Sequence, residues 1–447
     1  MNAGSPTPLD AIRAVLSRSG MGASQLLPAE VSHKARLMLL DTIACMLAAR
    51  SAPEVLAMES AQSLTEAGSF RFPGGKPLTV LGAAAVGAMS ATWDEACEGL
   101  ALAHGRPGVP VIAALLPYAV THNLSLDTLL HSLVAGYEVG ARAGAWLRIR
   151  PGMHVDGNWP ALGVAAGLAD AMGLSHGAGC AALDIAACQL STSLYLPVAR
   201  GANARNTYLP HSAWLGLLAA NAAAAGVSAP EDALPHYADK FSAAGEGPGF
   251  DAKRYLILDA YFKPHAAVRH VHYGAQAASL LRARLPGGTT TITALRLNIY
   301  QEAITYCGNR APLHPIQAQF SLSFGVAAAL MHGGIEADVY RQENFNDAEL
   351  RRLEALVSIA PDLQLTAANA RGATLFIDAG GVTFEQAVGA IKGDPELPMT
   401  GPEVRAKFSR FVSAQVSAAS ADKFAETLLF GDPAMSTSEL WGLLSVH

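Results

Sequence analysis

The sequence predicts a mainly α-helical protein in which a large all-helical part is joined to a smaller part of mixed α and β structure. Apolar, alanine-rich segments with helical spacing fill most of the chain before residue 245 and return in the last fifty residues. The clearest strand pattern lies between these two regions, after a change of texture near residue 245. We therefore expect a helical domain over residues 1–252, an α+β domain over residues 253–392, and a helical C-terminal segment over residues 393–447.

The composition limits the classes of protein that the chain can form. Its 447 residues are 51% hydrophobic and 15% charged, which allows a large buried core and suggests two or three domains. The formal net charge of −6, with no basic run, argues against nucleic acid as the main partner. The alanine-rich stretches at residues 213–226 and 324–331 are shorter than a membrane span, and the first residues carry no signal-peptide pattern. We therefore expect a cytoplasmic protein without a membrane partner.

Cysteine usage and motifs give no sign of a cofactor. No CxxC pair is present, which is typical of reduced thiols, although spacing alone leaves a three-cysteine iron–sulfur site open. The chain has no G-x-G-x-x-G, Walker or G-x-S-x-G motif, so nucleotide-dependent chemistry and a hydrolase triad are weakly supported. His270 and His272 could bind a metal from a strand, but no carboxylate–histidine set at ligand spacing accompanies them. We therefore expect neither a cofactor nor a metal. The five cysteines are Cys45, Cys97, Cys180, Cys188 and Cys307.

The N-terminal helices are predicted from the spacing of apolar residues. Two helices are expected before residue 50, and the second, over residues 31–49, has an apolar face at helical spacing. Asp41 lies inside this face, and we expect it to be a buried hydrogen-bonding residue rather than a catalyst. The turn-rich segment that follows is expected to be extended at residues 78–81, before helices resume at Ala83.

Two further helices are expected between residues 111 and 146. In the second of them, Gly136 and Gly140 lie one turn apart and would allow a neighbouring helix to pack closely. Glu138 and Arg142 are spaced i,i+4, so we expect a local ion pair between them.

A break in the helical pattern at residues 195–211 carries two candidate substrate-binding arginines, Arg200 and Arg205. Glycine, asparagine and proline surround them, and we expect a short mobile cationic loop between buried helices. Arginine can hold a carboxylate with two parallel hydrogen bonds, which suits a polycarboxylate substrate. The alternative is a solvated loop whose arginines cap helices.

The α+β part is predicted from β-branched alternation and turn residues. A strand is expected within residues 289–306, and residues 314–334 lead into a buried helix. Residues 346–360 are expected to form a helix that Asn346 or Asp347 caps. Two short strands joined by a glycine-containing turn are expected in residues 363–388, and the last fifty residues return to helix.

The segment WDEACEGLALAHGRPGVP, residues 93–110, contains a candidate acid/base pair, Asp94 and His104, between two alanine-rich helical runs. A hydrogen bond from a carboxylate would fix the tautomer of the imidazole and raise its basicity. The alternative is a carboxylate at a helix end and an ordinary loop histidine. His154 is a third candidate, because it precedes the N-terminus of a Gly/Ala-rich helix, where backbone N–H groups favour anions.

The order of these features resembles the MmgE/PrpD family, which includes 2-methylcitrate dehydratase, cis-aconitate decarboxylase and iminodisuccinate epimerase. The resemblance spans nearly the whole chain and depends on six segments in the family's order. They are ARLMLLDTIACMLAA, the Asp94 and His104 spacing, GMHVDGNWPALGVAAGLADAMGLS, HSAWLGLLAANAAAAG, FKPHAAVRH and AQFSLSFGVAAAL.

The resemblance implies a helical domain built from both chain ends, a smaller α+β lid domain, and a site between them. It also implies acid/base chemistry next to a carboxylate, no cofactor, and commonly a homodimer. By position, Asp94, His104, His154 and Lys263 would take the family's site roles.

The chain departs from the family pattern at several positions. Arg205 stands where decarboxylase-type members carry a lysine, and Phe324 stands at the site tyrosine. Asp156 replaces a usual threonine, and Glu95 and Cys97 occupy positions that are often filled differently. Arginine stays protonated and phenylalanine has no proton to give, so two candidate acids would be missing. Epimerisation then fits better than expulsion of hydroxide or loss of carbon dioxide, and more of the proton transfer would run through the histidines.

The resulting hypothesis is an acid/base enzyme that acts at the Cα–H of a small dicarboxylate or tricarboxylate, as an epimerase of the iminodisuccinate epimerase type. His104 would be the base, oriented by Asp94, and Lys263 or His154 would deliver the proton. The runner-up is a hydro-lyase of the 2-methylcitrate dehydratase type or a cis-aconitate decarboxylase-like lyase, and the alternative from another class is a non-catalytic scaffold. The residues expected to hold carboxylates are Arg200, Arg205 and Arg269.

Overall fold

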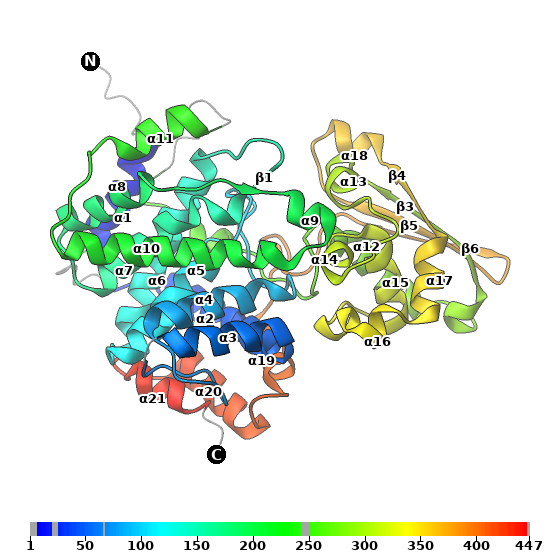
Figure 1. Cartoon of the computed structure of the whole chain (residues 1–447). Coiled ribbons are helices and arrows are strands. Elements are labelled where there is room, and N and C mark those ends of the chain that lie inside the picture. The colour runs from blue at the N-terminus through cyan, green and yellow to red at the C-terminus, as the bar shows by residue number, and fades with distance from the viewer. Residues whose placement is uncertain (1–6, 20–25, 66–67, 243–250, 252, 445–447) are drawn as a thin grey trace.

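Helices dominate the computed structural model, which describes residues 7–19, 26–65, 68–242, 251 and 253–444. A large helical body stands beside a smaller α+β lid, and the C-terminal helices lie with the helical body (Figure 1). This confirms the predicted mainly α fold with a smaller α+β part. The domain limits at residues 252/253 and 392/393 stay predictions. The linker-like segment GEGPGFD, residues 245–251, lies outside the described residues except for Asp251.

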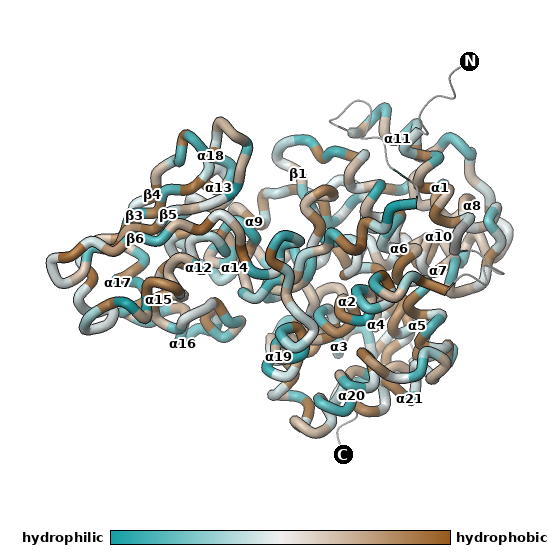
Figure 2. Tube along the Cα trace, turned by 180° about the vertical axis from the view of Figure 1, so that it is seen from behind, coloured by the Kyte–Doolittle hydropathy of each residue, from teal (hydrophilic) through white to brown (hydrophobic). Residues whose placement is uncertain are grey.

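The helical body contains elements from both ends of the chain. In chain order they are α1 (Pro8–Ser19), α2 (Ala29–Ala48), α3 (Pro53–Thr65), α4 (Val80–Trp93), α5 (Gly108–Thr121), α6 (Leu126–Trp146), α7 (Pro160–Ala171), α8 (His176–Ala187), α9 (Leu196–Arg200), α10 (Tyr208–Ala224), α11 (Ala233–Phe241), α19 (Gly401–Val412), α20 (Ala418–Phe430) and α21 (Thr437–Gly442). Hydrophobic stretches gather where α5, α6 and α7 pack together (Figure 2). None of the described helices combines the length and apolarity that crossing a membrane requires.

Glycines bring α6 and α7 close together. A Cβ added at Gly136 would lie 2.7 Å from the carbonyl oxygen of Gly163 on α7, and one added at Gly163 would lie 3.2 Å from Cα of Gly140. Neither approach leaves room for a larger side chain. The predicted close packing at Gly136 and Gly140 is therefore confirmed.

Two buried ion pairs lie in this body, and one of them joins segments that are distant in sequence. Lys407 on α19 donates to Asp41 on α2 at 2.6 Å and to the carbonyl oxygen of Ala96 at 2.7 Å. Asp41 is thus a buried hydrogen-bonding residue, as predicted, and the pair ties the C-terminal helices to the start of the chain. Glu138 and Arg142 form the predicted i,i+4 ion pair, with both side chains fully buried.

The lid is built on a four-stranded sheet with the order β4-β3-β5-β6. Strand β3 runs parallel to β4 and antiparallel to β5, and β5 and β6 form the predicted hairpin through Gly380 and Gly381. Helix α12 packs against β5, β6 and α15. The elements of the lid are α12 (Val271–Arg282), β3 (Ile292–Ile299), α13 (Gln301–Cys307), α14 (Pro315–Gln319), α15 (Leu322–His332), α16 (Gln342–Phe345), α17 (Ala348–Leu356), β4 (Val357–Pro361), α18 (Leu363–Ala367), β5 (Ala373–Ala379) and β6 (Val382–Val388).

Three local predictions are wrong in whole or in part. Asp347 caps α17 as expected, but the helix ends at Leu356, and the following VSIAP forms β4 because its β-branched residues pair with β3. Thr79 caps α4, so the helix begins at Val80, and only the first half of the stretch 78–81 is extended: Leu78 pairs with Phe70, and Thr79 has extended dihedral angles. The segment expected to be a mobile loop contains helix α9 and the 3₁₀ turn η3 (Asn203–Thr207), which places Arg205 in the interior.

Candidate active site

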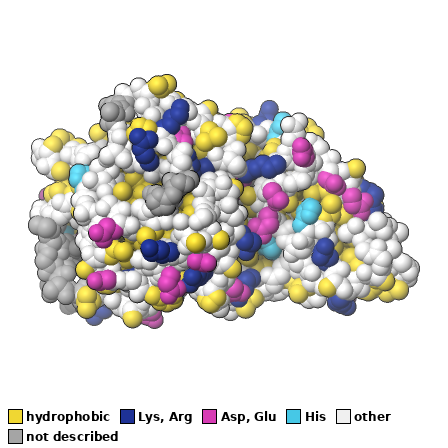
Figure 3. All heavy atoms as spheres, turned by 90° about the horizontal axis from the view of Figure 1, so that it is seen from below, with side chains coloured by type: hydrophobic (Ala, Val, Ile, Leu, Met, Phe, Trp, Pro, Cys, Tyr) yellow, Lys and Arg dark blue, Asp and Glu magenta, His cyan; other side chains and the backbone are white. Residues whose placement is uncertain are grey.

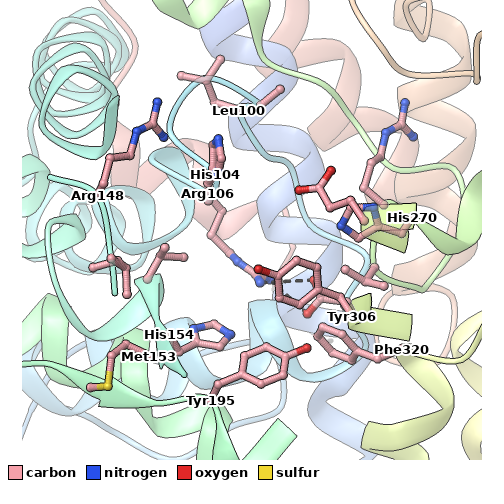
Figure 4. A pocket seen from close by; sticks show the side chains of 18 of the residues that line it. Leu100, His104, Arg106, Arg148, Met153, His154, Tyr195, His270, Tyr306 and Phe320 are labelled. Carbon is pink, nitrogen blue, oxygen red and sulfur yellow. Dashed lines mark hydrogen bonds and ion pairs between the residues drawn. The ribbon is translucent and has the colours of Figure 1, made fainter. Parts of the chain in front are cut away.

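A cavity of about 440 Å³ lies between the helical body and the lid (Figure 4). Its walls come from the loop between α4 and α5, the segment after α6, the segment that leads into α12, and helix α13. Seen from below, basic, acidic and histidine side chains lie side by side near the junction of body and lid (Figure 3). The titratable residues in the wall are Glu95, Glu98, His104, Arg106, Arg148, Arg150, His154, Tyr195, Tyr261, Lys263, Arg269, His270, Glu302, Tyr306 and Arg371.

Glu95 is the centre of a buried charged cluster at one side of this cavity. Its carboxylate accepts from Lys263 Nζ at 2.9 Å and from Arg205 Nη2 at 2.8 Å, and its Oε1 lies 3.2 Å from Arg106 Nη2. Burial alone would raise the pKa of Glu95, but the charges of these three cations hold it well below its ordinary value. Glu95 therefore stays ionised and holds Lys263 and Arg106 at the cavity wall.

Asp156 supplies the second carboxylate of the cluster. Its Oδ1 lies 3.3 Å from Arg106 Nε, and its Oδ2 lies 3.9 Å from Arg205 Nη2. Three cations thus share two carboxylates, Glu95 and Asp156, which leaves one positive charge in excess within the cluster. An excess of this sign beside a cavity favours an anionic ligand.

Asp156 also orients His154. The backbone N–H of Asp156 donates to Nδ1 of His154 at 3.2 Å, so the neutral ring carries its proton on Nε2. Burial lowers the pKa of His154 to about 4, although the negative charge of Asp156 opposes the shift. The ring lies in the cavity near Tyr195, with 6.1 Å between ring centroids (Figure 4). His154 is therefore a neutral N–H donor near pH 7.

Asp94 and His104 do not form the predicted acid/base pair. The carboxylate of Asp94 is buried at the end of α4 and accepts from Arg341 Nη1 of the lid at 3.3 Å, and the residue is not part of the cavity wall. In the part of the chain that the structure describes, no hydrogen bond or ion pair joins it to His104. Glu95, at φ 53°, turns the chain immediately after Asp94, so the following loop carries His104 away from Asp94 and into the cavity wall.

His104 itself lies in the cavity wall, at a sharp turn of the same loop. Its φ is also 53°, and the bridge between Leu100 and Gly105 closes the loop around it. Partial enclosure lowers the pKa of His104, and the positive charge of Arg148 lowers it further. A neutral imidazole facing the cavity is therefore available as a proton acceptor. Backbone strain of this kind is concentrated at functional sites.

The other predicted site residues take different positions. Lys263 and Arg269 lie in the cavity wall, and Arg269 donates from Nε to Asp394 at 2.9 Å. Arg205 is buried behind Glu95 rather than exposed to the cavity, so it positions the carboxylate. Arg200 is exposed at the end of α9 and is not part of the wall, so the structure does not bring it to the site.

Sequence reasoning missed several residues that line the cavity. Tyr195, Tyr261 and Tyr306 reach the wall from three separate segments, and nothing in their local sequence marks them. Phe324, by contrast, is buried in α15 against Tyr340 and is not in the wall. The expectation that more of the proton transfer runs through the histidines stays a prediction, and the phenolic groups in the wall are further candidate acids.

Glu98 and Arg106 were also missed, although both lie inside the segment that contains Asp94 and His104. The signal was present, because Glu98 and Arg106 are charged residues in the same short loop, between two buried helices, that holds Glu95 and His104.

The histidines that suggested a metal site have other partners. His270 Nδ1 lies 2.6 Å from the hydroxyl of Tyr300, and His272 Nε2 lies 3.0 Å from the carbonyl oxygen of Ala267. Both residues belong to the start of α12 and not to a strand. Among the described residues, no three His, Cys, Asp or Glu side chains gather as a metal-binding group.

The fold and the charged cavity define a two-part enzyme-like molecule whose site lies between a helical body and a lid. The model of the MmgE/PrpD N-terminal domain matches residues 23–252, and that of the MmgE/PrpD C-terminal domain matches residues 265–429. The chain therefore belongs to the MmgE/PrpD family, whose members include dehydratases, decarboxylases and epimerases. A search of curated proteins finds no match.

The lowered pKa of His154 makes stability depend on pH. The pKa of the histidine is near 6.5 in the unfolded chain and about 4 in the folded protein. Between these two values the unfolded chain binds a proton that the folded protein does not bind, so the folded state loses stability as pH falls from 6.5 to about 4. We expect His154→Gln to reduce the loss between pH 6.5 and about 4 by up to about 3 kcal/mol. Urea unfolding at several pH values measures this, and His332→Gln, an exposed histidine of α15, is the control. Equal pH slopes in the wild type and His154→Gln would contradict the prediction.

Proposed function

We propose that this chain is a cofactor-independent acid/base enzyme that removes a proton from the carbon next to a carboxylate of a small dicarboxylate or tricarboxylate. The observation that carries the proposal is the pairing of an uncompensated positive charge with neutral imidazoles in one cavity. Within the family, we favour an epimerase of the iminodisuccinate epimerase type.

Cations are available for at least two carboxylates. Arg106 and Lys263 form one group beside Glu95, with one charge in excess. Arg148 lies near His104, and its Nη1 donates to the backbone carbonyl of Leu102 at 3.3 Å. Among the described residues, no carboxylate forms an ion pair with Arg148. Arginine and lysine at two places in one cavity suit a ligand with carboxylates at both ends. This separation supports a dicarboxylate or tricarboxylate over a monocarboxylate.

The acid/base groups fit enolate chemistry. His104 is exposed to the cavity and neutral, so it can accept the proton from Cα. The negative charge that then develops on the adjacent carboxylate or imine would be stabilised by Nε2–H of His154 and by the ammonium of Lys263. Asp94 has no orienting role in this scheme, because its carboxylate faces Arg341.

One observation favours the runner-up, a hydro-lyase of the 2-methylcitrate dehydratase type. Expulsion of hydroxide needs an acid beside the leaving group, and the phenols of Tyr195 and Tyr306 lie in the wall. A decarboxylase-like lyase would need the same kind of acid. The non-catalytic scaffold remains the alternative from another class, and we expect a cytoplasmic homodimer in each case.

Incubation of the wild-type protein with candidate polycarboxylates in deuterium oxide tests the proposal. An epimerase places deuterium at Cα of the recovered substrate, which appears as loss of a proton NMR signal. A lyase instead produces an alkene that absorbs in the ultraviolet. Alkene formation without exchange would reject the epimerase in favour of the lyase. If no candidate substrate gave either signal, the non-catalytic scaffold would be favoured.

A further inference from the structure

Glu98 is a buried carboxyl group in the cavity wall with one oxygen held and the other without a partner. The residue is 1% exposed, and Oε1 accepts hydrogen bonds from the backbone N–H groups of Gly108 at 2.8 Å and Val109 at 3.1 Å, in the first turn of α5. Oε2 is buried and has no hydrogen-bond partner in the described chain. An orphaned carboxyl oxygen in a native interior needs an explanation, and a ligand group is one.

The groups that face Glu98 come from four segments. Lys34 and Asp41 belong to α2, Arg106 to the loop before α5, Tyr137 to α6, and Tyr261 to the segment that crosses into the lid. Burial raises the pKa of Glu98 to about 7, although the two N–H groups at the start of α5 and the charge of Arg106 oppose the shift. Asp41 adds to the rise through its negative charge. Glu98 can therefore hold or release a proton near neutral pH.

The position of Oε1 decides where that proton sits. Because Oε1 already accepts from two N–H donors, the acidic proton belongs on Oε2. Glu98 is one of the residues that line the cavity, so the first turn of α5 holds a carboxyl group with an exchangeable proton in the cavity wall. A close backbone approach is required here, since a Cβ at Gly108 would lie 2.5 Å from Met38 Sδ and 3.1 Å from Glu98 Oε1.

We propose that Glu98 is a second acid/base catalytic residue of this cavity, opposite in role to His104, for epimerisation of a polycarboxylate at Cα. This rests on the proposed function. In one direction His104 takes the Cα proton, the C–H electron pair passes into the enolate, and Glu98 Oε2–H gives a proton to the carbon. The enolate pair forms the new C–H bond, and the O–H pair stays on the carboxylate. In the reverse direction Glu98 carboxylate takes the proton and the His104 imidazolium returns one.

The test uses Glu98→Gln and separates the two half-reactions. The amide keeps an oxygen that accepts from Gly108 and Val109 but cannot transfer a proton, so we expect kcat to fall by about 10²–10⁴-fold. Deuterium exchange should persist from the stereoisomer that His104 deprotonates and vanish from the other. His104→Gln should show the complementary loss. Affinity for an unreactive tricarboxylate such as tricarballylate should be unchanged, and Glu98→Asp should recover part of the rate.

Glu354→Gln is the matched control. Glu354 is also buried, its pKa is also raised to about 7 by burial, and it pairs with Arg351 in the lid, outside the cavity wall. It should leave both exchange reactions intact. The infrared difference spectrum between the wild type and Glu98→Gln near neutral pH should contain a protonated carboxyl band, which reports on the carboxyl group of Glu98 without any substrate.

The outcomes separate this proposal from the proposed function. Normal turnover and exchange from both stereoisomers in Glu98→Gln would overturn the role of Glu98 and leave the proposed function standing. No exchange by the wild-type protein with any polycarboxylate would overturn both. If Glu98→Gln fails to fold, the variant Glu98→Asp tests the role instead. The displaced carboxyl group should slow deuterium exchange from one stereoisomer more than from the other. Equal slowing of exchange from both stereoisomers would reject the role of Glu98.

Discussion

Replacing Glu95 by glutamine is expected to lower the free energy of unfolding by about 3–5 kcal/mol, the usual cost of breaking a buried ion pair from one side. Lys263, Arg205 and Arg106 share this carboxylate, and each is buried. Without the negative charge of Glu95, Asp156 is the one carboxylate of the described cluster that offsets three cations, although Lys263 still donates to the backbone carbonyl oxygen of residue 95. Guanidinium unfolding of the wild type and variant at equal ionic strength measures the loss.

The same variant should respond more strongly to anions than the wild type. The cations that no longer pair with residue 95 can bind a carboxylate from solution. A polycarboxylate such as citrate should therefore raise the thermal midpoint of Glu95→Gln by more than that of the wild type. Glu426→Gln is the control, because it removes the same charge from an exposed pair with Arg405 and should change stability by less than ~0.5 kcal/mol. A loss below ~1 kcal/mol in Glu95→Gln would mean that the cluster does not share one carboxylate.

Elements whose residues carry a local signal could be predicted, and those defined by a distant partner could not. Helix α6 has a serine cap, Ser125, and an apolar pattern that fixes both ends, and the structure has the predicted residues 126–146. Strand β4 has only five residues and follows a helix without a break. Its identity comes from the parallel pairing of Val357 with Leu295 on β3, more than sixty residues away, which no local window contains.

The candidate site shows the same division. His104, His154 and Lys263 could be selected by their positions in the segments that resemble the family, and Arg269 as a cation suited to a carboxylate, and the structure places all four in one cavity wall. The partner of Asp94 could not be selected, because Arg341 lies 247 residues away, in the lid. Sequence spacing measures distance along the chain, whereas the left-handed residue at position 95 separates the side chains of Asp94 and His104 in space.

Burial gives Arg200 and Arg205, which were predicted to share one role, different positions in the structure. Arg200 and Arg205 are five residues apart in a segment of uniform composition, so their sequence context does not distinguish them. Helix α9 ends at Arg200 and leaves it exposed, whereas the 3₁₀ turn that follows directs Arg205 onto Glu95. Only the three-dimensional path of the chain decides which arginine faces solvent and which neutralises a buried carboxylate.

Replacing His104 by glutamine is expected to lower kcat by about 10²–10⁴-fold, the range for loss of one general base. Glutamine is close in size and polar, but it cannot accept a proton at neutral pH, so the change isolates proton transfer from packing. His104 is exposed in the cavity wall, and the hydrogen bond that its backbone N–H donates to the carbonyl oxygen of Ala101 at 3.1 Å is retained in the variant. The thermal midpoint should therefore stay close to that of the wild type.

The pH profile of the wild-type enzyme provides an independent check on His104. A base must be unprotonated to act, so kcat/KM should rise as pH increases through the pKa of His104. Enclosure and the charge of Arg148 lower this pKa, so the acidic limb should lie below the ordinary histidine value of 6.5. Arg148→Gln removes one of these causes and should move the limb toward 6.5, whereas Arg150→Gln, two residues further along the same wall, should not. Full activity in His104→Gln would assign the proton transfer to another group in the cavity. An acidic limb at the same pH in Arg148→Gln and in the wild type would lead to the same conclusion.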